Sequence, residues 1–363
     1  MGLNVVAHER TGFERILELR DDDAGLRGLL VIHSTVRGPA FGGIRRRIFD
    51  AADPSGKLAW SRARDEVLDL AEAMSLKCAL ASLDAGGGKC VMLDHPGLDR
   101  AAAYRAFGRV IESLDGNYVC GPDVGSGDAE LAYMRAETEY VNPVENDASA
   151  RTAEGVLAGL RATVSACFGA PTFAERSFAV EGLGAVGSAV ARSLQAVGAR
   201  VSGYDPDPEA ARRAASMGVR VHRSIETLDA EACEILVPCA LGASLRTIRL
   251  ERASYRGICG SANNQLDTPD VDAGLRDKGI FWAPDFAVSA GAVIEGVLAV
   301  ESLWANSAPS RELIEQRVAA RIADIERTCE QIFVRSARTG RGTGAVAESM
   351  ARRAMRSTQP PTG

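Results

Sequence analysis

Histidine, aromatic residues and long apolar runs are all scarce in this chain of 363 residues. The four histidines, His8, His33, His95 and His222, lie far apart in the sequence, so a histidine-based metal centre is not expected. No apolar stretch approaches the length of a membrane-spanning helix, and the N-terminus lacks the apolar core of a signal peptide. These absences predict a cytoplasmic protein without a membrane partner.

The eight cysteines are scattered along the chain without CxxC spacing, so they are not expected to bind a metal. Several of them stand in apolar segments, for example Cys90 and Cys167. Such cysteines behave as small buried hydrophobic residues. The pattern favours free thiols in a reducing compartment over disulfides or metal ligands.

The net charge of −6 and the lack of a compensating basic stripe argue against a nucleic-acid partner. The one basic run, Arg45-Arg46-Arg47, is short. We expect it to form a solvated loop, with a phosphate or subunit contact as the alternative.

The length fits two domains, and the first 145 residues are predicted to form an α+β domain. Residues 29–33 are apolar and β-branched, which predicts a strand, and residues 38–43 contain the breakers of a loop. Residues 61–76 have a helical period, with Lys77 placed just after the helix. Residues 78–93 should form extended segments broken by three glycines, and residues 100–114 a second helix.

The second domain is predicted over residues 146–329, after a polar, proline-containing break at residues 142–147. Strand and helix patterns alternate from there on, which predicts a doubly wound parallel sheet of the Rossmann type. The whole chain is therefore assigned to the α/β class. Residues 330–363 should be helical before a disordered end, and they are expected to fold back onto the first domain.

The segment Ala81 to Lys89 presents one lysine directly after Gly86-Gly87-Gly88, and Lys77 stands twelve positions earlier. Glycine permits positive φ and leaves room for a ligand, so we expect this segment to be a loop. A lysine beside another cation in a water-poor cleft can act as a base near neutral pH, while its neighbour binds a carboxylate. Asp123 lies after a Gly-Pro turn and would exchange protons. Solvated surface charges are the alternative interpretation.

A dinucleotide fingerprint spans Gly182 to Gly187, between a predicted strand and a predicted helix, with Asp205 eighteen residues further on. Gly182 permits the turn, Gly184 lets the backbone approach a pyrophosphate, and Gly187 allows close packing of helix and strand. The helix start at Ala185-Val186 offers free N–H groups to phosphates. Asp205 would accept hydrogen bonds from ribose hydroxyls and repel a 2′-phosphate, which favours NAD; Arg212 and Arg213 could overturn this preference.

Further motifs run along nearly the whole chain in a fixed order. They are Gly38-Pro39-Ala40-Phe41-Gly42-Gly43, Met74-Ser75-Leu76-Lys77, Asp123-Val124-Gly125, Thr152-Ala153-Glu154-Gly155-Val156, Pro238-Cys239-Ala240-Leu241-Gly242-Ala243, Gly260-Ser261-Ala262-Asn263-Asn264 and Ala283-Pro284-Asp285-Phe286. With these motifs the chain resembles the leucine/valine/phenylalanine dehydrogenases of the glutamate dehydrogenase superfamily.

The resemblance implies reversible NAD-dependent oxidative deamination of an apolar L-amino acid, branched-chain or aromatic, to the 2-oxo acid and ammonia. Lys77 matches the lysine that binds the α-carboxylate, Lys89 the lysine that activates water, and Asp123 the aspartate that exchanges protons with the amino group. The remaining positions match substrate-binding residues (Phe41, Gly42, Gly43, Met74, Ser289 and Val293) and cofactor-binding residues (Thr152, Cys239, Ala240 and Asn263). Relatives of this kind are commonly homo-oligomers.

Several positions depart from the family pattern. Ser289 stands where the family has asparagine, Ala292 replaces a glycine, and Cys78 follows Lys77 in place of asparagine. Pro122 precedes Asp123, and Phe41 replaces the leucine of leucine-specific members. Two alternatives therefore stay open: a dehydrogenase or reductase of an unusual amino or oxo acid, and a paralogue that binds NAD without turnover.

Overall fold

The computed structural model divides into two compact units, and each is described by itself. Unit 1 comprises residues 1–145, 296–314 and 352–363, and unit 2 comprises residues 146–295 and 315–351. The chain past residue 295 is thus shared between the units. The residues that the structure describes are 2–142, 147–240, 242, 244–247, 249, 254–301 and 310–356. Most of the predicted break at residues 142–147 and the predicted disordered end at residues 359–363 lie outside them.

Unit 1 is built on a six-stranded mixed sheet in the order β1-β2-β3-β5-β4-β6. The pairs β1–β2, β2–β3 and β3–β5 are antiparallel, whereas β4 runs parallel to both β5 and β6. The strands are β1 (Asn4–His8), β2 (Arg15–Asp21), β3 (Leu26–Ser34), β4 (Ala40–Arg47), β5 (Gly86–Leu93) and β6 (Tyr118–Gly121).

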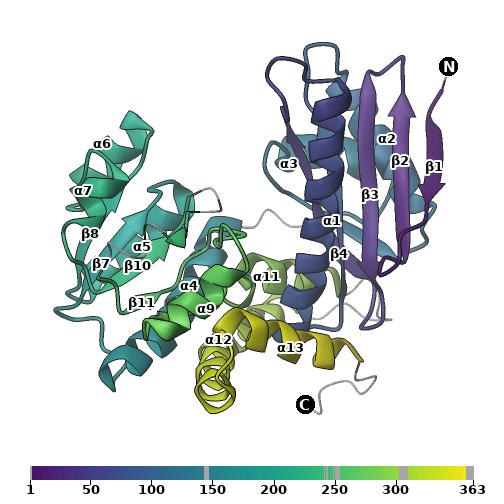
Figure 1. Cartoon of the computed structure of the whole chain (residues 1–363). Coiled ribbons are helices and arrows are strands. Elements are labelled where there is room, and N and C mark those ends of the chain that lie inside the picture. The colour runs from purple at the N-terminus through teal and green to yellow at the C-terminus, as the bar shows by residue number, and fades with distance from the viewer. Residues whose placement is uncertain are drawn as a thin grey trace. The chain divides into compact units, whose positions relative to one another are not determined.

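Helices cover both faces of this sheet (Figure 1). Helix α1 (Lys57–Leu80) packs small and branched residues such as Ala63 and Val67 against Val31 and Val91. On the other face lie α2 (Arg100–Glu112), whose first turn is capped by the Asp99 carboxylate, and α3 (Asp128–Arg135). Because β5 is covered on both sides, all eight of its residues are buried.

Four local predictions for unit 1 are wrong. The predicted loop at residues 38–43 ends at Ala40, where β4 begins, and the three glycines open β5 without positive φ at any of them. Lys77 lies inside α1, in its last turn, and the basic run forms the end of β4. The two glycine-rich segments form strands because their glycines let neighbouring backbones approach closely. A Cβ at Gly42 would overlap the carbonyl oxygen of Gly88, and a Cβ at Gly87 would overlap the backbone of Ser75.

Unit 2 contains a six-stranded sheet in the order β12-β11-β10-β7-β8-β9, and all five pairings are parallel. This confirms the predicted doubly wound sheet and the α/β class. The strands are β7 (Ser177–Glu181), β8 (Arg200–Tyr204), β9 (Arg220–Val221), β10 (Ile235–Pro238), β11 (Gly257–Ile258) and β12 (Phe281–Trp282).

Three described helices of unit 2 begin at polar side-chain caps: Asp147 for α4, Asp207 for α6 and Ser224 for α7. Gly169 ends α4 with φ +82°. The helices that lie wholly in unit 2 are α4 (Ala148–Phe168), α5 (Ala185–Ala196), α6 (Pro208–Ser216), α7 (Ile225–Asp229), α9 (Asp270–Asp277) and α10 (Asp285–Val288). Three helices are shared between the units: α11 (Gly291–Val300) begins in unit 2 and ends in unit 1, α12 (Arg311–Thr339) begins in unit 1, and α13 (Thr343–Arg356) ends in unit 1.

Candidate active site and family

Both predicted functional lysines are buried in unit 1. Lys77 is 8% exposed at the end of α1, and Lys89 is 6% exposed in the middle of β5. Helix α1 can approach β5 closely because Gly87 has no side chain to separate it from Ser75. Because both lysines are almost completely buried, the interpretation of these two residues as solvated surface charges is wrong.

Asp123 lies on a short turn after β6 and directly contacts Lys89. The Lys89 Nζ atom is 2.7 Å from Asp123 Oδ2, and backbone bonds in both directions between Asp123 and Ser126 hold the turn. Burial works to raise the pKa of the Asp123 carboxyl, but Lys89 and Arg45 outweigh it and hold that pKa well below its usual range. The carboxylate is therefore ionised throughout the neutral range.

The basic run supports this turn, which corrects its prediction as a solvated loop. Arg45 binds the Asp123 carboxylate and is 14% exposed. Arg46, 7% exposed and pointing to the opposite face, donates from its backbone to Val124 and from its side chain to the Gly125 carbonyl. Only Arg47 is substantially exposed, at 42%. Sequence analysis missed a signal in the alternation of side chains between the two faces of a strand. In β4, Phe41, Gly43 and Arg45 share one face, so Arg45 follows the predicted substrate residues.

The predicted substrate residues of unit 1 lie on or beside β4. Phe41 is 5% exposed, and Met74 is 8% exposed on α1, three residues before Lys77. The Gly42 carbonyl accepts a hydrogen bond from the Tyr118 hydroxyl at 3.1 Å, a contact that sequence analysis did not foresee. A Cβ at Gly43 would lie 2.5 Å from the Pro122 carbonyl oxygen, so glycine is what lets the Asp123 turn approach β4.

The glycine fingerprint of unit 2 joins β7 to α5 as predicted. Gly182 has φ +90°, and a Cβ there would lie 2.7 Å from Ala240 N and 2.8 Å from Cys239 C, so the ends of β7 and β10 meet at this turn. A Cβ at Gly187 would overlap the Gly182 carbonyl oxygen. By contrast, the space over Gly184 is open, and α5 begins at Ala185 without a side-chain cap. Free N–H groups facing open space fit a dinucleotide pyrophosphate.

Asp205 follows β8 and is fixed beside the fingerprint. Its Oδ2 accepts from the backbone of Leu183 at 2.7 Å and its Oδ1 from that of Asp207 at 2.8 Å. A carboxylate has capacity for further bonds, so ribose hydroxyls can still be accepted. Arg212 and Arg213 are 75% and 64% exposed and pair with Glu209. These contacts give no sign of a built site for a 2′-phosphate.

The remaining predicted residues lie in unit 2, and their roles stay predictions. The Thr152 hydroxyl donates to Ala148 within α4, and a Cβ at Gly291 would lie 3.1 Å from Thr152 N. Ser289 is 6% exposed just before α11, and Val293 is half-buried within it. The carbonyl oxygen of Asn263 lies against Gly242.

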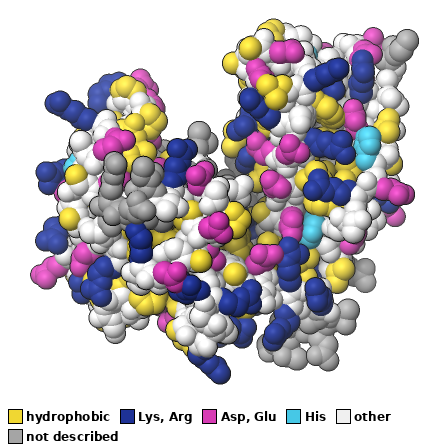
Figure 2. All heavy atoms as spheres, in the orientation of Figure 1, with side chains coloured by type: hydrophobic (Ala, Val, Ile, Leu, Met, Phe, Trp, Pro, Cys, Tyr) yellow, Lys and Arg dark blue, Asp and Glu magenta, His cyan; other side chains and the backbone are white. Residues whose placement is uncertain are grey.

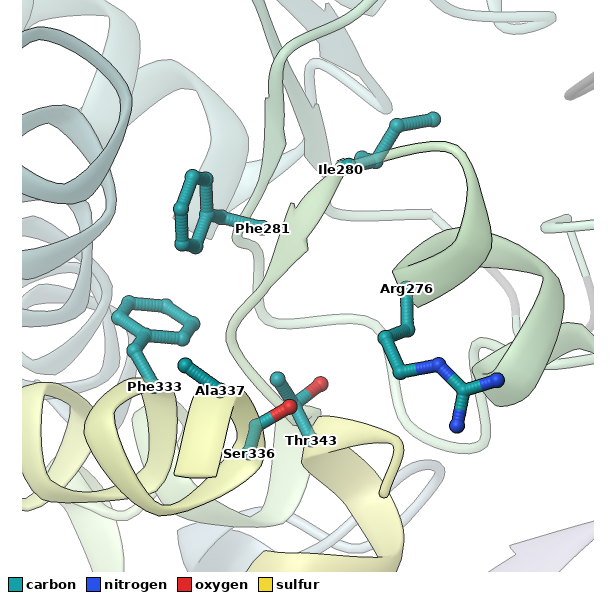
Figure 3. Close-up of a pocket in the computed structure, with 8 residues that line it drawn as sticks. Arg276, Ile280, Phe281, Phe333, Ser336, Ala337 and Thr343 are labelled. Atoms are coloured by element: carbon teal, nitrogen blue, oxygen red, sulfur yellow. The ribbon is translucent and has the colours of Figure 1, made fainter. Parts of the chain in front are cut away.

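A cavity of about 200 Å³ in unit 2 contains none of the predicted site residues (Figure 3). It is lined by the edge-to-face rings of Phe281 and Phe333, whose centroids are 5.5 Å apart, and by Arg276 and Thr343. Arg276 already pairs with Asp277 and the Gly340 carbonyl. The lining of this cavity thus includes neither the predicted lysines nor Asp123, and we do not assign the catalytic site to it.

All eight cysteines are free thiols, seven of them buried and Cys239 half-buried. Burial raises the pKa of Cys78 to about 12 and that of Cys167 to about 11, which makes them poor nucleophiles.

Within the described ranges, no cluster of potential metal ligands and no helix able to cross a membrane occurs. Figure 2 shows basic and acidic side chains interspersed over the visible face.

Family models match most of the chain. Residues 13–140 match the Glu/Leu/Phe/Val dehydrogenase dimerisation domain, and residues 209–359 match the Glutamate/Leucine/Phenylalanine/Valine dehydrogenase model. The chain belongs to this dehydrogenase family. Residues 150–250 also match the NAD-binding domain of D-isomer specific 2-hydroxyacid dehydrogenases, in agreement with the fingerprint and the parallel sheet.

Relatives with named activities agree with this assignment. A phenylalanine dehydrogenase of Bacillus thermotolerans is 36% identical over 295 residues, which cover 78% of this chain and 75% of that protein. A leucine dehydrogenase of Geobacillus stearothermophilus is 31% identical over 94% of this chain and 90% of that protein. The structure of L-tryptophan dehydrogenase from Nostoc punctiforme superposes with a TM-score of 0.77 at 27% identity, covering 96% of this chain and 97% of that one.

The resemblance predicted from the motifs is thereby confirmed. This family member is an NAD-dependent amino-acid dehydrogenase that acts on the CH–NH2 group of an apolar amino acid. The small-molecule substrate class and the NAD cofactor agree with the predictions, and the match to a dimerisation domain supports oligomerisation.

Proposed function

We propose that unit 1 binds the amino-acid substrate and carries out the proton transfers, and that unit 2 binds NAD. The observation that carries this proposal is the buried Lys89–Asp123 ion pair, with its 2.7 Å contact. A buried pair of opposite charge next to a glycine-rich backbone is typical of general acid–base machinery.

In the oxidative direction Lys77 binds the substrate carboxylate and orients the Cα–H bond. When bound, NAD supplies the acceptor for the hydride that leaves Cα. The substrate thereby becomes an iminium, and Lys89 takes a proton from the water that attacks it. Asp123 takes a proton from the substrate ammonium group before the hydride leaves, and it returns that proton to the departing amino group. The products are the 2-oxo acid and ammonia.

We propose that the side chain of the substrate is branched or aromatic. The predicted substrate residues Phe41, Met74 and Val293 are all apolar, and the named relatives are dehydrogenases of phenylalanine, leucine and tryptophan. Lys77, Lys89 and Asp123 serve the part of the substrate that all amino acids share, so they do not select among side chains.

The test of the function is NADH formation by the purified full chain with each of the twenty L-amino acids at alkaline pH. Turnover with branched or aromatic substrates supports the proposal and ranks the side chains. NAD binding without turnover on any of the twenty would contradict it, and would favour an unusual substrate or a non-catalytic paralogue.

We further propose a homo-oligomer that assembles through unit 1 in the cytoplasm. Strand β1 is an edge strand with exposed Val5 (41%) and Val6 (43%), which suits contact with another subunit. The free cysteines are consistent with a reducing compartment.

Phe41 is expected to limit the size of the substrate side chain. A Cβ at Gly296 would lie 2.6 Å from Phe41 Cζ, so the ring is packed tightly on that glycine within unit 1. Phe41→Leu should raise the kcat/KM ratio of phenylalanine over valine by about tenfold, since a change of one or two methylenes is worth 1–3 kcal/mol. Phe49→Leu, a buried phenylalanine against α1, is the control. An unchanged ratio in the Phe41 variant would remove it from the substrate pocket.

Asp205 is expected to set the cofactor preference. Asp205→Asn keeps an oxygen for the Leu183 amide but removes the charge that repels a 2′-phosphate. The preference for NAD over NADP, measured as the ratio of kcat/KM values, should fall by roughly tenfold, as expected for a loss of about 1.4 kcal/mol. Asp207→Asn, which retains its capping role at α6, should leave the ratio unchanged. Equal ratios in both variants would contradict the assignment.

A further inference from the structure

Arg45 makes a contact that the roles described above do not use. Its Nε donates to Asp123 Oδ2 at 3.0 Å, and its Nη2 to Asp123 Oδ1 at 3.3 Å, so one guanidinium holds both carboxylate oxygens. Its remaining nitrogen, Nη1, donates to Glu66 Oε1 on α1 at 2.6 Å. A planar guanidinium bound on both sides by carboxylates is a rigid support.

We propose that Arg45 is a positioning residue for the dehydrogenase reaction, which fixes the Asp123 carboxylate in the orientation that faces Lys89. This inference rests on the proposed catalytic roles of Lys89 and Asp123. It assigns to Arg45 no contact with the substrate or with NAD.

Asp123 needs such a support because its backbone bonds fix the turn but do not fix the direction of the carboxylate. The residue lies on a turn that an isolated two-residue bridge to Ser126 holds, and its carboxylate otherwise contacts only Lys89 among the ion pairs of the described residues. Without Arg45, only the single contact with Lys89 would be left among these ion pairs to fix the orientation of the carboxylate.

The chemistry of the guanidinium suits this task better than a second lysine would. Lys89 gains and loses a proton in the proposed cycle, so its attraction for Asp123 changes from step to step. Arginine does not titrate in proteins, and Arg45 therefore holds Asp123 equally in every step. Glu66 keeps the guanidinium in place and also binds Arg47 Nη2 at 3.1 Å.

Removal of Arg45 should shift the pH dependence of the activity in a predictable direction. Burial raises the pKa of Asp123 while the two cations lower it, so loss of one cation lets that pKa rise. If the reaction requires ionised Asp123, the variant should lose activity at a higher pH than the wild type does as the solution is made more acidic. The titratable and charged groups around Asp123 are Lys89 on β5, Arg45 on β4, Glu66 on α1, and Tyr118 and Cys120 on β6.

The test compares Arg45→Gln, Arg45→Lys and Arg47→Gln in the full chain, with NAD and the best substrate of the amino-acid panel. Arg45→Gln should lower kcat by about 10²-fold with little change in KM, because a positioning loss acts on the proton transfers. The acidic limb of its kcat profile should move to higher pH. Arg45→Lys restores the positive charge but cannot bind both carboxylate oxygens in the same planar way. The acidic limb of its kcat profile should therefore return to the wild-type pH, while kcat stays reduced.

Arg47→Gln is the matched control, because Arg47 lies on the same face of β4 and binds Glu66 but not Asp123. Its kcat and acidic limb should equal those of the wild type. A wild-type profile in Arg45→Gln, or the same loss in both glutamine variants, would overturn the proposal. If Arg45→Gln does not fold, Arg45→Lys decides: a lowered kcat with intact NAD binding supports the inference, and a wild-type kcat refutes it. Failure of the proposed function is separate, since it would appear as an inactive wild type.

Discussion

Lys89→Ala should reduce kcat by at least about 10²–10⁴-fold, the range that general acid–base groups contribute. The substitution removes the Nζ atom that lies 2.7 Å from Asp123, and no other lysine lies in β5 to replace it. NAD binding, which we assign to unit 2, should be unaffected. Steady-state kinetics and a direct titration of NAD with the same preparation measure the two properties independently.

Lys57→Ala is the control for this experiment, because Lys57 is exposed at the start of α1. It should leave kcat unchanged. Turnover near the wild-type rate in Lys89→Ala would show that another group activates the water. Loss of NAD binding together with turnover would instead indicate a defect of the fold, and the catalytic assignment would need a gentler variant such as Lys89→Met.

Gly87→Ala should destabilise the protein by about 1–3 kcal/mol, the usual penalty for overpacking a core. The added methyl would overlap the backbone nitrogen and the hydroxyl of Ser75, two residues before Lys77, so α1 must move away from β5. The midpoint of urea denaturation should fall, and KM for the amino acid should rise because Lys77 is displaced.

Gly274→Ala is the matched control, since nothing lies within 4 Å of a Cβ there and the residue is inside α9. Alanine is favoured over glycine in helices by about 0.8–1.0 kcal/mol, so this variant should be as stable as the wild type or more so. A Gly87→Ala variant with an unchanged midpoint would mean that β5 and α1 are not packed through backbone contact.

Predictions that depend on local pattern agree with the structure. The alternation of apolar strands and helices predicted the parallel sheet of unit 2, and the glycine spacing placed the turn between β7 and α5. These features depend on periodicity and on phosphate-binding backbone geometry, which a short stretch of sequence encodes by itself. The buried state of Lys77 and Lys89 agrees with the apolar, glycine-rich surroundings that singled them out.

Predictions that took glycine as a loop former failed in unit 1. Gly42, Gly43 and the three glycines before Lys89 lie in strands, where they allow neighbouring backbones to approach. The sequence alone does not distinguish a glycine that bends the chain from one that makes room for another segment. That distinction depends on partners far along the chain, such as Ser75 for Gly87.

The sequence by itself determined the fold class of unit 2, the dinucleotide fingerprint and the lysine and aspartate candidates, because each depends on residue type and short spacing. The tertiary structure alone decided that Arg45 belongs with Asp123, 78 positions away, and that the basic run supports a turn. The physical reason is that parallel strand pairing brings β4, β5 and β6 side by side, and charges buried at that junction must neutralise one another.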